Sequence, residues 1–135
     1  MPVVDTEVVF ALNPRDPKHQ KALKLLEAGR GLVVPDTVMF EFQAVLRARG
    51  RSPSEVKIAL LAVSEALTRH GVVEVKTVST SLLAIQCELE EAYGLSYFDS
   101  LVAASSLAVD CRIVSDDEAF DRVLELNRIP LSQTE

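Results

Sequence analysis

The chain alternates short apolar runs with longer amphipathic segments, and this alternation predicts its architecture. The apolar runs predict strands at residues 2–4, 32–34, 72–75, 112–114 and 129–131. The longer segments, in which apolar positions recur at helical spacing, predict helices near residues 16–28, 36–49, 53–69, 79–93, 97–109 and 118–127. Alternating strands and helices indicate a single α/β domain over residues 1–135, with a mainly parallel sheet covered by helices on both faces.

The turn residues between these segments support the same division. Ser52, Pro53 and Glu55 offer an N-cap, a proline in the first helical turn and a capping-box glutamate. A glycine also stands just past several predicted helix ends, where a left-handed residue commonly terminates a helix. These glycines are Gly29, Gly50, Gly71 and Gly94.

Length and charge narrow the classes of function. A chain of 135 residues can bury a real core, and no apolar run is long enough to span a bilayer. The start of the chain lacks the basic leader and apolar segment of a signal peptide, so we expect a cytoplasmic protein with no membrane partner. The formal net charge of −6 argues against a protein that coats nucleic acid, but not against an enzyme that approaches a phosphate through a metal ion.

A local basic cluster and two cysteines add little by themselves. Arg47, Arg49 and Arg51 lie at the end of the helix predicted over residues 36–49. Contact with a phosphate backbone and compensation of the helix dipole explain these arginines equally well. Cys87 and Cys111 fit no metal-binding spacing, and we expect them to be buried free thiols.

Glu41 is the most unusual residue of the chain. Helical geometry places it among Val38, Ala44 and Val45 on the apolar face of its helix, opposite Gln43. A lone buried carboxylate costs several kcal/mol unless it is protonated, paired or bound to a metal. We therefore expect Glu41 to point toward the interior, beside a group that compensates its charge.

Other acidic residues gather at one edge of the predicted sheet, where ligands bind in open parallel sheets. They follow predicted strands or open the next helix, and are Asp5, Asp36, Asp99, Asp116 and Asp117. Carboxylates forced together raise one another's pKa unless a cation sits between them. Oxygen ligands favour Mg²⁺ or Mn²⁺, and the absence of nearby His and Cys disfavours zinc.

Each of these acids also has a structural explanation. Asp36 is suited to cap its helix, and Ser96 with Asp99 resembles a capping box. A turn could explain Asp5, and one of Asp116 and Asp117 could cap the helix predicted to begin at Glu118. We interpret Glu7 as a residue of a solvated turn. Neither a cap nor a solvated face explains Glu41, so the structural explanation is weakest there.

Three stretches combine the acids with distinctive neighbours, and run over residues 3–6, 95–104 and 113–120. Their most specific parts are Tyr97-Phe98-Asp99 and Ser115-Asp116-Asp117, the latter followed by Phe120. With Glu41 between them, these stretches resemble a PIN domain, in particular the single-domain, VapC-like ribonuclease toxins. The resemblance covers nearly the whole chain, from Val3 to about Leu126.

The resemblance implies a three-layer α/β/α fold with a five-stranded parallel sheet, a Mg²⁺ or Mn²⁺ site, and metal-dependent hydrolysis of RNA. The family's acidic positions fall on Asp5, Glu41, Asp99 and Asp117, which would be both the metal ligands and the catalytic residues. Asp116 stays open as a further ligand. Candidates for contacts with the RNA are Thr6, Ser115, Arg47, Arg49 and Arg51.

Two positions depart from the family pattern. Ser115 replaces a threonine and keeps the hydroxyl, whereas Glu7 stands where a serine or asparagine is common. The resemblance also implies a homodimer and, for a toxin, an antitoxin protein as partner.

Two other functions remain open. The first is a PIN-like scaffold without catalysis that binds a protein, or a second copy of itself, through the acidic face. The second is a phosphatase or receiver domain, which is disfavoured because the paired acids and the late lysine of those families are absent. Metal-dependent cleavage of RNA distinguishes the leading hypothesis from both.

Overall fold

A five-stranded parallel sheet forms the centre of the protein in the computed structural model, which describes residues 1–29 and 31–133. The strands are β1 (Val3–Val4), β2 (Val33–Pro35), β3 (Val73–Val75), β4 (Arg112–Val114) and β5 (Asn127–Ile129). They lie side by side in the order β3-β2-β1-β4-β5. Val3 of the central strand pairs with Val33 on one side and Ile113 on the other. The predicted five-stranded parallel sheet is confirmed.

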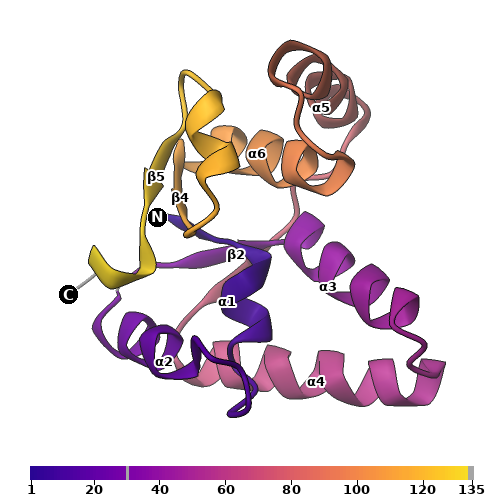
Figure 1. Cartoon of the computed structure of the whole chain (residues 1–135), viewed down its shortest axis with the longest axis vertical. Coiled ribbons are helices and arrows are strands. Elements are labelled where there is room, and N and C mark those ends of the chain that lie inside the picture. Colours follow the sequence, from indigo (N-terminus) through magenta and orange to yellow (C-terminus); the bar gives the residue numbers. More distant parts are fainter. Residues whose placement is uncertain (30, 134–135) are drawn as a thin grey trace.

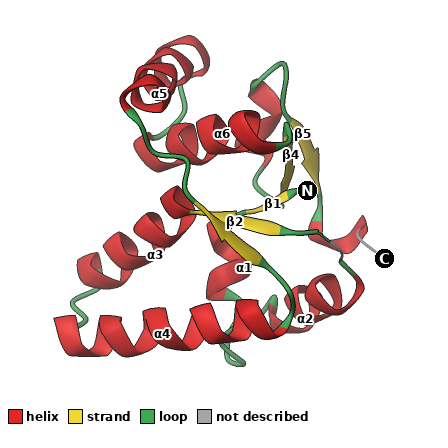
Figure 2. Ribbon diagram, turned by 180° about the vertical axis from the view of Figure 1, so that it is seen from behind, coloured by secondary structure: helices red, strands yellow, loops and turns green. Residues whose placement is uncertain are grey.

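Helices cover both faces of this sheet (Figure 1). They are α1 (Thr6–Phe10), α2 (His19–Ala28), α3 (Asp36–Ala48), α4 (Pro53–Arg69), α5 (Thr80–Tyr93), α6 (Tyr97–Val109) and the short 3₁₀ helices η1 (Glu118–Arg122) and η2 (Leu131–Gln133). Helices α5 and α6 lie on one side, and α1, α2 and α4 on the other. Helix α3 runs outward from the sheet between the two layers, as Figures 1 and 2 both show.

The core explains why the central strands are apolar on both faces. Val3, Val4, Val33, Val34 and Ile113 are almost wholly buried, as expected for parallel strands covered by helices on each side. Burial holds β1 and β4 rigidly in register, so the residues that follow them emerge side by side at the carboxyl edge of the sheet.

Two elements differ from the sequence predictions. The helix predicted over residues 118–127 is wrong, because only Glu118–Arg122 is helical, as 3₁₀, and Asn127–Ile129 pairs with β4 as β5. Phe120, Val123 and Leu126 are buried three residues apart, a spacing that also fits an amphipathic helix. Strand β5 thus begins two residues before the predicted run at 129–131. Helix α1 was not predicted, because its five residues are too short to show a periodic pattern.

The predictions for the glycines and cysteines were partly wrong. Gly50, Gly71 and Gly94 have positive φ as expected, but Gly29 is extended, with φ −69° and ψ 142°. Cys87 is exposed, because α5 turns Leu82, Gln86 and Leu89 inward and leaves Cys87 on its outer face. Cys111 is partly exposed.

Across the described ranges, no helix combines the length and apolarity that crossing a membrane requires.

Candidate active site

Asp5 lies at the end of β1, where it caps α1. Its side chain is only 7% exposed. One carboxylate oxygen accepts the Thr6 N–H at 2.7 Å, and the other accepts the Ser115 hydroxyl at 2.7 Å. Burial raises the pKa of Asp5 to about 7, against the lowering effect of these two hydrogen bonds, and the charges of Glu7 and Glu41 add to the rise. Asp5 is therefore a carboxyl group that two hydrogen bonds hold in place and that titrates near neutral pH.

Glu41 lies on α3 and reaches the residue next to Asp5. The Thr6 hydroxyl donates to its Oε1 at 2.5 Å. Burial raises the pKa of Glu41, and the charges of Asp99 and Asp117 raise it further, although the bond from Thr6 opposes them. The side chain is half-buried rather than enclosed in the core. Glu41 thus points toward the edge of the sheet, where the carboxylates of Asp99 and Asp117 are its neighbours. It does not lie in the enclosed interior.

Asp99 occupies the first turn of α6. Its N–H donates to the Ser96 hydroxyl at 3.1 Å, so Ser96 is the N-cap. Burial raises the pKa of the half-buried Asp99 side chain, and the charge of Asp117 adds to the rise. The Ser96 hydroxyl and the Arg122 guanidinium act in the opposite direction. Arg122 is a basic residue near the acids, and no motif of the sequence singled it out.

The two adjacent aspartates after β4 have different surroundings. Asp117 is exposed and caps η1, with its Oδ1 accepting the Ala119 N–H at 2.9 Å. Its own N–H donates to the Ser115 hydroxyl at 3.0 Å, the same hydroxyl that donates to Asp5. Asp117 also raises the pKa values of Glu41 and Asp99. Asp5, Glu41, Asp99 and Asp117, called here the acid group, thus come together from β1, α3, α6 and the turn after β4.

Asp116 is bound by other partners. Its carboxylate accepts the Lys18 ammonium at 3.0 Å and the Leu131 N–H at 3.0 Å. Although burial opposes them, these partners hold the pKa of Asp116 below its ordinary value. Glu7 joins this arrangement by accepting the Asp116 N–H at 2.6 Å and the Lys18 ammonium at 3.4 Å. The interpretation of Glu7 as a solvated turn residue was therefore wrong, because α1 carries it against the β4 loop.

Asp36 lies at the same edge but holds two segments of the chain together. The N-cap position of α3 is Pro35, so the predicted cap is displaced by one residue. The Asp36 carboxylate accepts the Thr77 hydroxyl at 2.7 Å, and also the N–H groups of Thr37, Thr77 and Val78. These bonds hold its pKa below the ordinary value despite burial. Asp36 therefore anchors α3 to the segment after β3.

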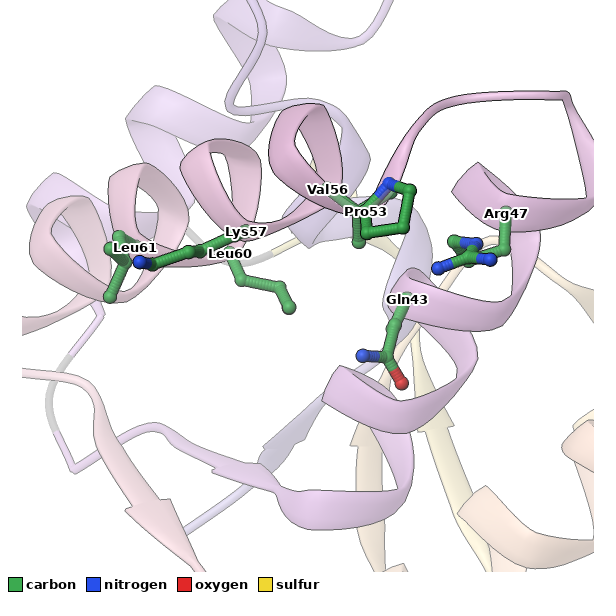
Figure 3. Close-up of a pocket in the computed structure, with 7 residues that line it drawn as sticks. All are labelled: Gln43, Arg47, Pro53, Val56, Lys57, Leu60 and Leu61. Carbon is green, nitrogen blue, oxygen red and sulfur yellow. The ribbon is translucent and has the colours of Figure 1, made fainter.

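The predicted arginines lie at the far end of α3. Arg49 stacks over the Phe10 ring, 5.0 Å from its centroid, and Arg51 pairs with Glu55 at 3.6 Å. Arg47 lines a small pocket between α3 and the first turns of α4 (Figure 3). At the α-helical rise of ~1.5 Å per residue, Arg47 lies about 9 Å along the axis from Glu41. Arg49 and Arg51 therefore contact Phe10 and Glu55 rather than the acid group.

The acid group suits a hydrated hard cation. Its donors are all oxygens, and burial and mutual repulsion raise the pKa of Asp5, Glu41 and Asp99. A bound cation would relieve that repulsion. Within the described ranges, however, no three His, Cys, Asp or Glu side chains stand close enough to enclose an ion. This arrangement fits Mg²⁺, which binds through few carboxylates and keeps several waters.

Comparison with known proteins agrees with this architecture. The family model of the PIN domain matches residues 3–126 of the chain. No curated protein sequence matches it significantly.

Several solved structures share the fold. The sarcin–ricin-loop-cleaving toxin VapC20 of Mycobacterium tuberculosis is 19% identical, with a TM-score of 0.70 over 90% of this chain and 93% of the other. The VapBC2 complex of Rickettsia felis, bound to a fragment of its promoter DNA, contains a chain that is 19% identical. Its TM-score is 0.65 over 95% of this chain and 96% of the other. A toxin–antitoxin complex of Klebsiella pneumoniae contains a chain that is 13% identical, with a TM-score of 0.66 over 93% of this chain and 95% of the other.

Proposed function

Because the chain belongs to the PIN domain family, we propose that it is a metal-dependent endoribonuclease that hydrolyses RNA phosphodiester bonds. The observation that carries the proposal is the acid group. Its members come from four separate segments, and burial and neighbouring negative charges raise the pKa of Asp5, Glu41 and Asp99. Structural neighbours that are an RNA-loop-cleaving toxin and toxin–antitoxin complexes support the further proposal that it is a toxin with an antitoxin partner, acting in the cytoplasm.

The acid group divides into ligands and a base. Asp5, Asp99 and Asp117 would hold Mg²⁺ or Mn²⁺, directly or through water. When bound, the ion supplies a Lewis acid that activates water and offsets charge on the phosphorane-like transition state. Glu41 accepts the proton of the attacking water at its carboxylate, since a raised pKa suits a general base near neutral pH. The Thr6 hydroxyl orients Glu41, and the Ser115 hydroxyl orients Asp5.

Asp117, rather than Asp116, belongs to this group. The carboxylate of Asp116 already accepts two donors, from Lys18 and Leu131. Its role is to fix the turn after β4 and so to hold Asp117 toward Glu41 and Asp99. Thr6 and Ser115 act through their neighbouring carboxylates. Arg47, Arg49 and Arg51, at or beyond the end of α3, would contact the RNA backbone away from the reacting phosphate.

A scaffold without catalysis is the second candidate. One observation favours it: in the part of the chain that the structure describes, the acids do not form a ready cage for an ion. In that case the acidic face would bind a basic partner and Glu41 would be dispensable. Cleavage of RNA separates the two functions directly.

The test is cleavage of a single-stranded RNA, labelled at one end, with Mn²⁺, with Mg²⁺ and with EDTA. The nuclease proposal predicts metal-dependent cleavage that Asp99→Asn abolishes. Glu88→Gln is the matched control, because it removes an exposed carboxylate on α5. Cleavage that is equal in EDTA, or retained by Asp99→Asn, would overturn the proposal.

A further inference from the structure

Three aromatic side chains meet beside the acid group. Phe40 of α3 and Phe98 of α6 pack edge to face, with ring centroids 5.6 Å apart and planes at 71°. Tyr97 contacts Phe98 in the same way, at 5.3 Å and 70°. Phe98 also packs against the core. The three rings, called here the aromatic platform, are therefore held together by the partly buried Phe98, which both outer rings contact.

The outer rings of the platform are open to solvent. Phe40 is 52% exposed and Tyr97 is 50% exposed. Both lie on regular helices with buried neighbours, such as Phe42 on α3 and Leu101 on α6. Large exposed rings that both pack on one partly buried ring indicate a binding surface, because leaving them in water forgoes the free energy of burial.

The platform is tied to the acids by sequence and by the contact between α3 and α6. Phe40 immediately precedes Glu41, and Phe98 immediately precedes Asp99. The helix contact that joins the two rings also brings the two carboxylates together, as the effect of Asp99 on Glu41 records. A nucleotide whose phosphate lies at the acids would have its base within reach of the rings.

Electrostatics explain why such a surface is needed. The chain carries a formal net charge of −6, and the acid group repels a phosphate backbone. Near the far end of α3, Arg49 stacks on Phe10 and Arg51 pairs with Glu55. Stacking of bases on aromatic rings needs no positive charge and accepts every base. The platform can therefore supply affinity for single-stranded RNA that the charge of this protein cannot.

We propose that Phe40 and Tyr97, held by Phe98, stack a base of the RNA next to the phosphate that is cleaved. The proposal rests on the proposed nuclease function and names its substrate class, an unpaired segment of RNA. Arg122, which lies near Asp99 and donates to the Gly94 carbonyl at 3.3 Å, would contact the phosphate on the same side.

The first test distinguishes the effect of the aromatic rings on RNA binding from the effect of apolar side-chain bulk. Phe40→Leu with Tyr97→Leu keeps apolar side chains but removes the rings, whereas Phe40→Tyr with Tyr97→Phe keeps them. We expect the leucine pair to raise KM for single-stranded RNA about tenfold or more with kcat nearly unchanged, on the scale of one lost stacking contact. The ring-keeping pair should raise KM far less than the leucine pair does, and both pairs should melt as the wild type does. An unchanged KM in the leucine pair would overturn the proposal.

The second test measures stacking without cleavage. An RNA carrying 2-aminopurine is titrated with protein in EDTA, and the fluorescence of the base should be quenched by the wild type and far less by the leucine pair. Quenching without any nuclease activity would uphold the platform and refute the nuclease. Equal quenching by both proteins would refute the platform.

A second copy of the chain is the competing occupant of this surface. Analytical ultracentrifugation of the wild type and the leucine pair decides between a second copy and an RNA base as the occupant. The proposal predicts the same oligomeric state for both. A wild-type dimer that the leucine pair converts to monomer would show that the rings bury against a partner subunit, and would overturn it.

Discussion

Two sets of carboxylates lie at the same edge of the sheet, and the pKa of Asp5, Glu41 and Asp99 in one set is raised whereas the pKa of Asp116 in the other is lowered. In the acid group, burial raises the pKa of Asp5, Glu41 and Asp99, and neighbouring negative charges add to the rise. In the second set, called here the lysine-paired acids, Lys18 donates to Glu7 and Asp116, and the pKa of Asp116 falls despite burial. The donors that face each carboxylate, rather than the type of residue, decide the direction: Lys18 and the Leu131 N–H lower the pKa of Asp116 against the effect of burial.

This difference assigns roles to neighbours in the chain. A carboxylate already paired with lysine gains little from a metal, whereas unpaired carboxylates that repel one another gain most. The lysine-paired acids are therefore suited to hold the site in shape, and the acid group to bind the ion and carry out the chemistry. The predictions below test that division.

The largest effect should distinguish Asp117 from Asp116. We expect Asp117→Asn to lower kcat/KM for RNA by several orders of magnitude, because it removes a direct or water-mediated ligand of the metal. Asp116→Asn should cost far less, since Lys18 can shift to Glu7. Steady-state cleavage of a labelled RNA measures both. Equal losses would show that both aspartates serve the metal, and a larger loss at Asp116 would reverse the assignment.

The next effect concerns Glu41. Glu41→Gln keeps the shape of the side chain and can still accept the Thr6 hydroxyl, but it removes a half-buried charge from among other acids. We expect loss of at least about a hundredfold in kcat, on the scale of general-base catalysis, together with a small gain in stability without metal. Cleavage assays and urea unfolding measure the two. Full activity in this variant would exclude Glu41 from the mechanism.

A third prediction uses the pKa of Asp5, which is about 7 in the folded protein and about 3.9 in an unfolded chain. Between these values the folded state binds the proton more tightly, so the free energy of unfolding should fall as pH rises from about 4 to about 7 and then level off. At 1.36 kcal/mol per pKa unit, the loss is at most about 4 kcal/mol. Asp5→Asn should flatten the profile measured by urea unfolding in EDTA.

Asp116→Asn is the control for that profile. The pKa of Asp116 is lowered in the folded protein. Its ionised carboxylate therefore stabilises the fold above the ordinary aspartate pKa, and this stabilisation is lost only as the pH falls below that value. This variant should therefore be less stable than the wild type at every pH from 5 to 8, with the same slope. A slope that Asp116→Asn flattens, and Asp5→Asn leaves unchanged, would contradict the division between the two sets.

The smallest effect is stabilisation by the metal itself. An ion that binds only the folded state stabilises it by mass action, by about 1.4 kcal/mol at ten times its Kd. For a domain of this size we expect millimolar Mn²⁺ to raise the melting temperature by a few degrees. Asp99→Asn should weaken the shift and Glu88→Gln should not. A melting curve unchanged over a wide range of metal concentration would favour the scaffold.

Local patterns were enough for much of the fold. The helices over residues 36–48, 53–69, 80–93 and 97–109 match their predictions within a residue, because caps and apolar spacing act within a few positions of the chain. Runs of β-branched residues likewise located β2, β3 and β4 within a residue or two, although β3 is largely exposed at the edge of the sheet. The segment after Asp117 was mistaken for a helix because the spacing of Phe120, Val123 and Leu126 fits both structures.

The sequence by itself determined that acids following the strands reach the carboxyl edge of the sheet and that Glu41 lies on an apolar helix face, since the first follows from their positions after strands and the second from periodicity. Only the tertiary structure decided that Asp116 turns to Lys18 while Asp117 joins Glu41 and Asp99. It also decided that Glu7 supports the β4 loop and that Phe40 meets Phe98. These contacts join residues far apart in the chain, and their energies depend on distances that no local pattern encodes.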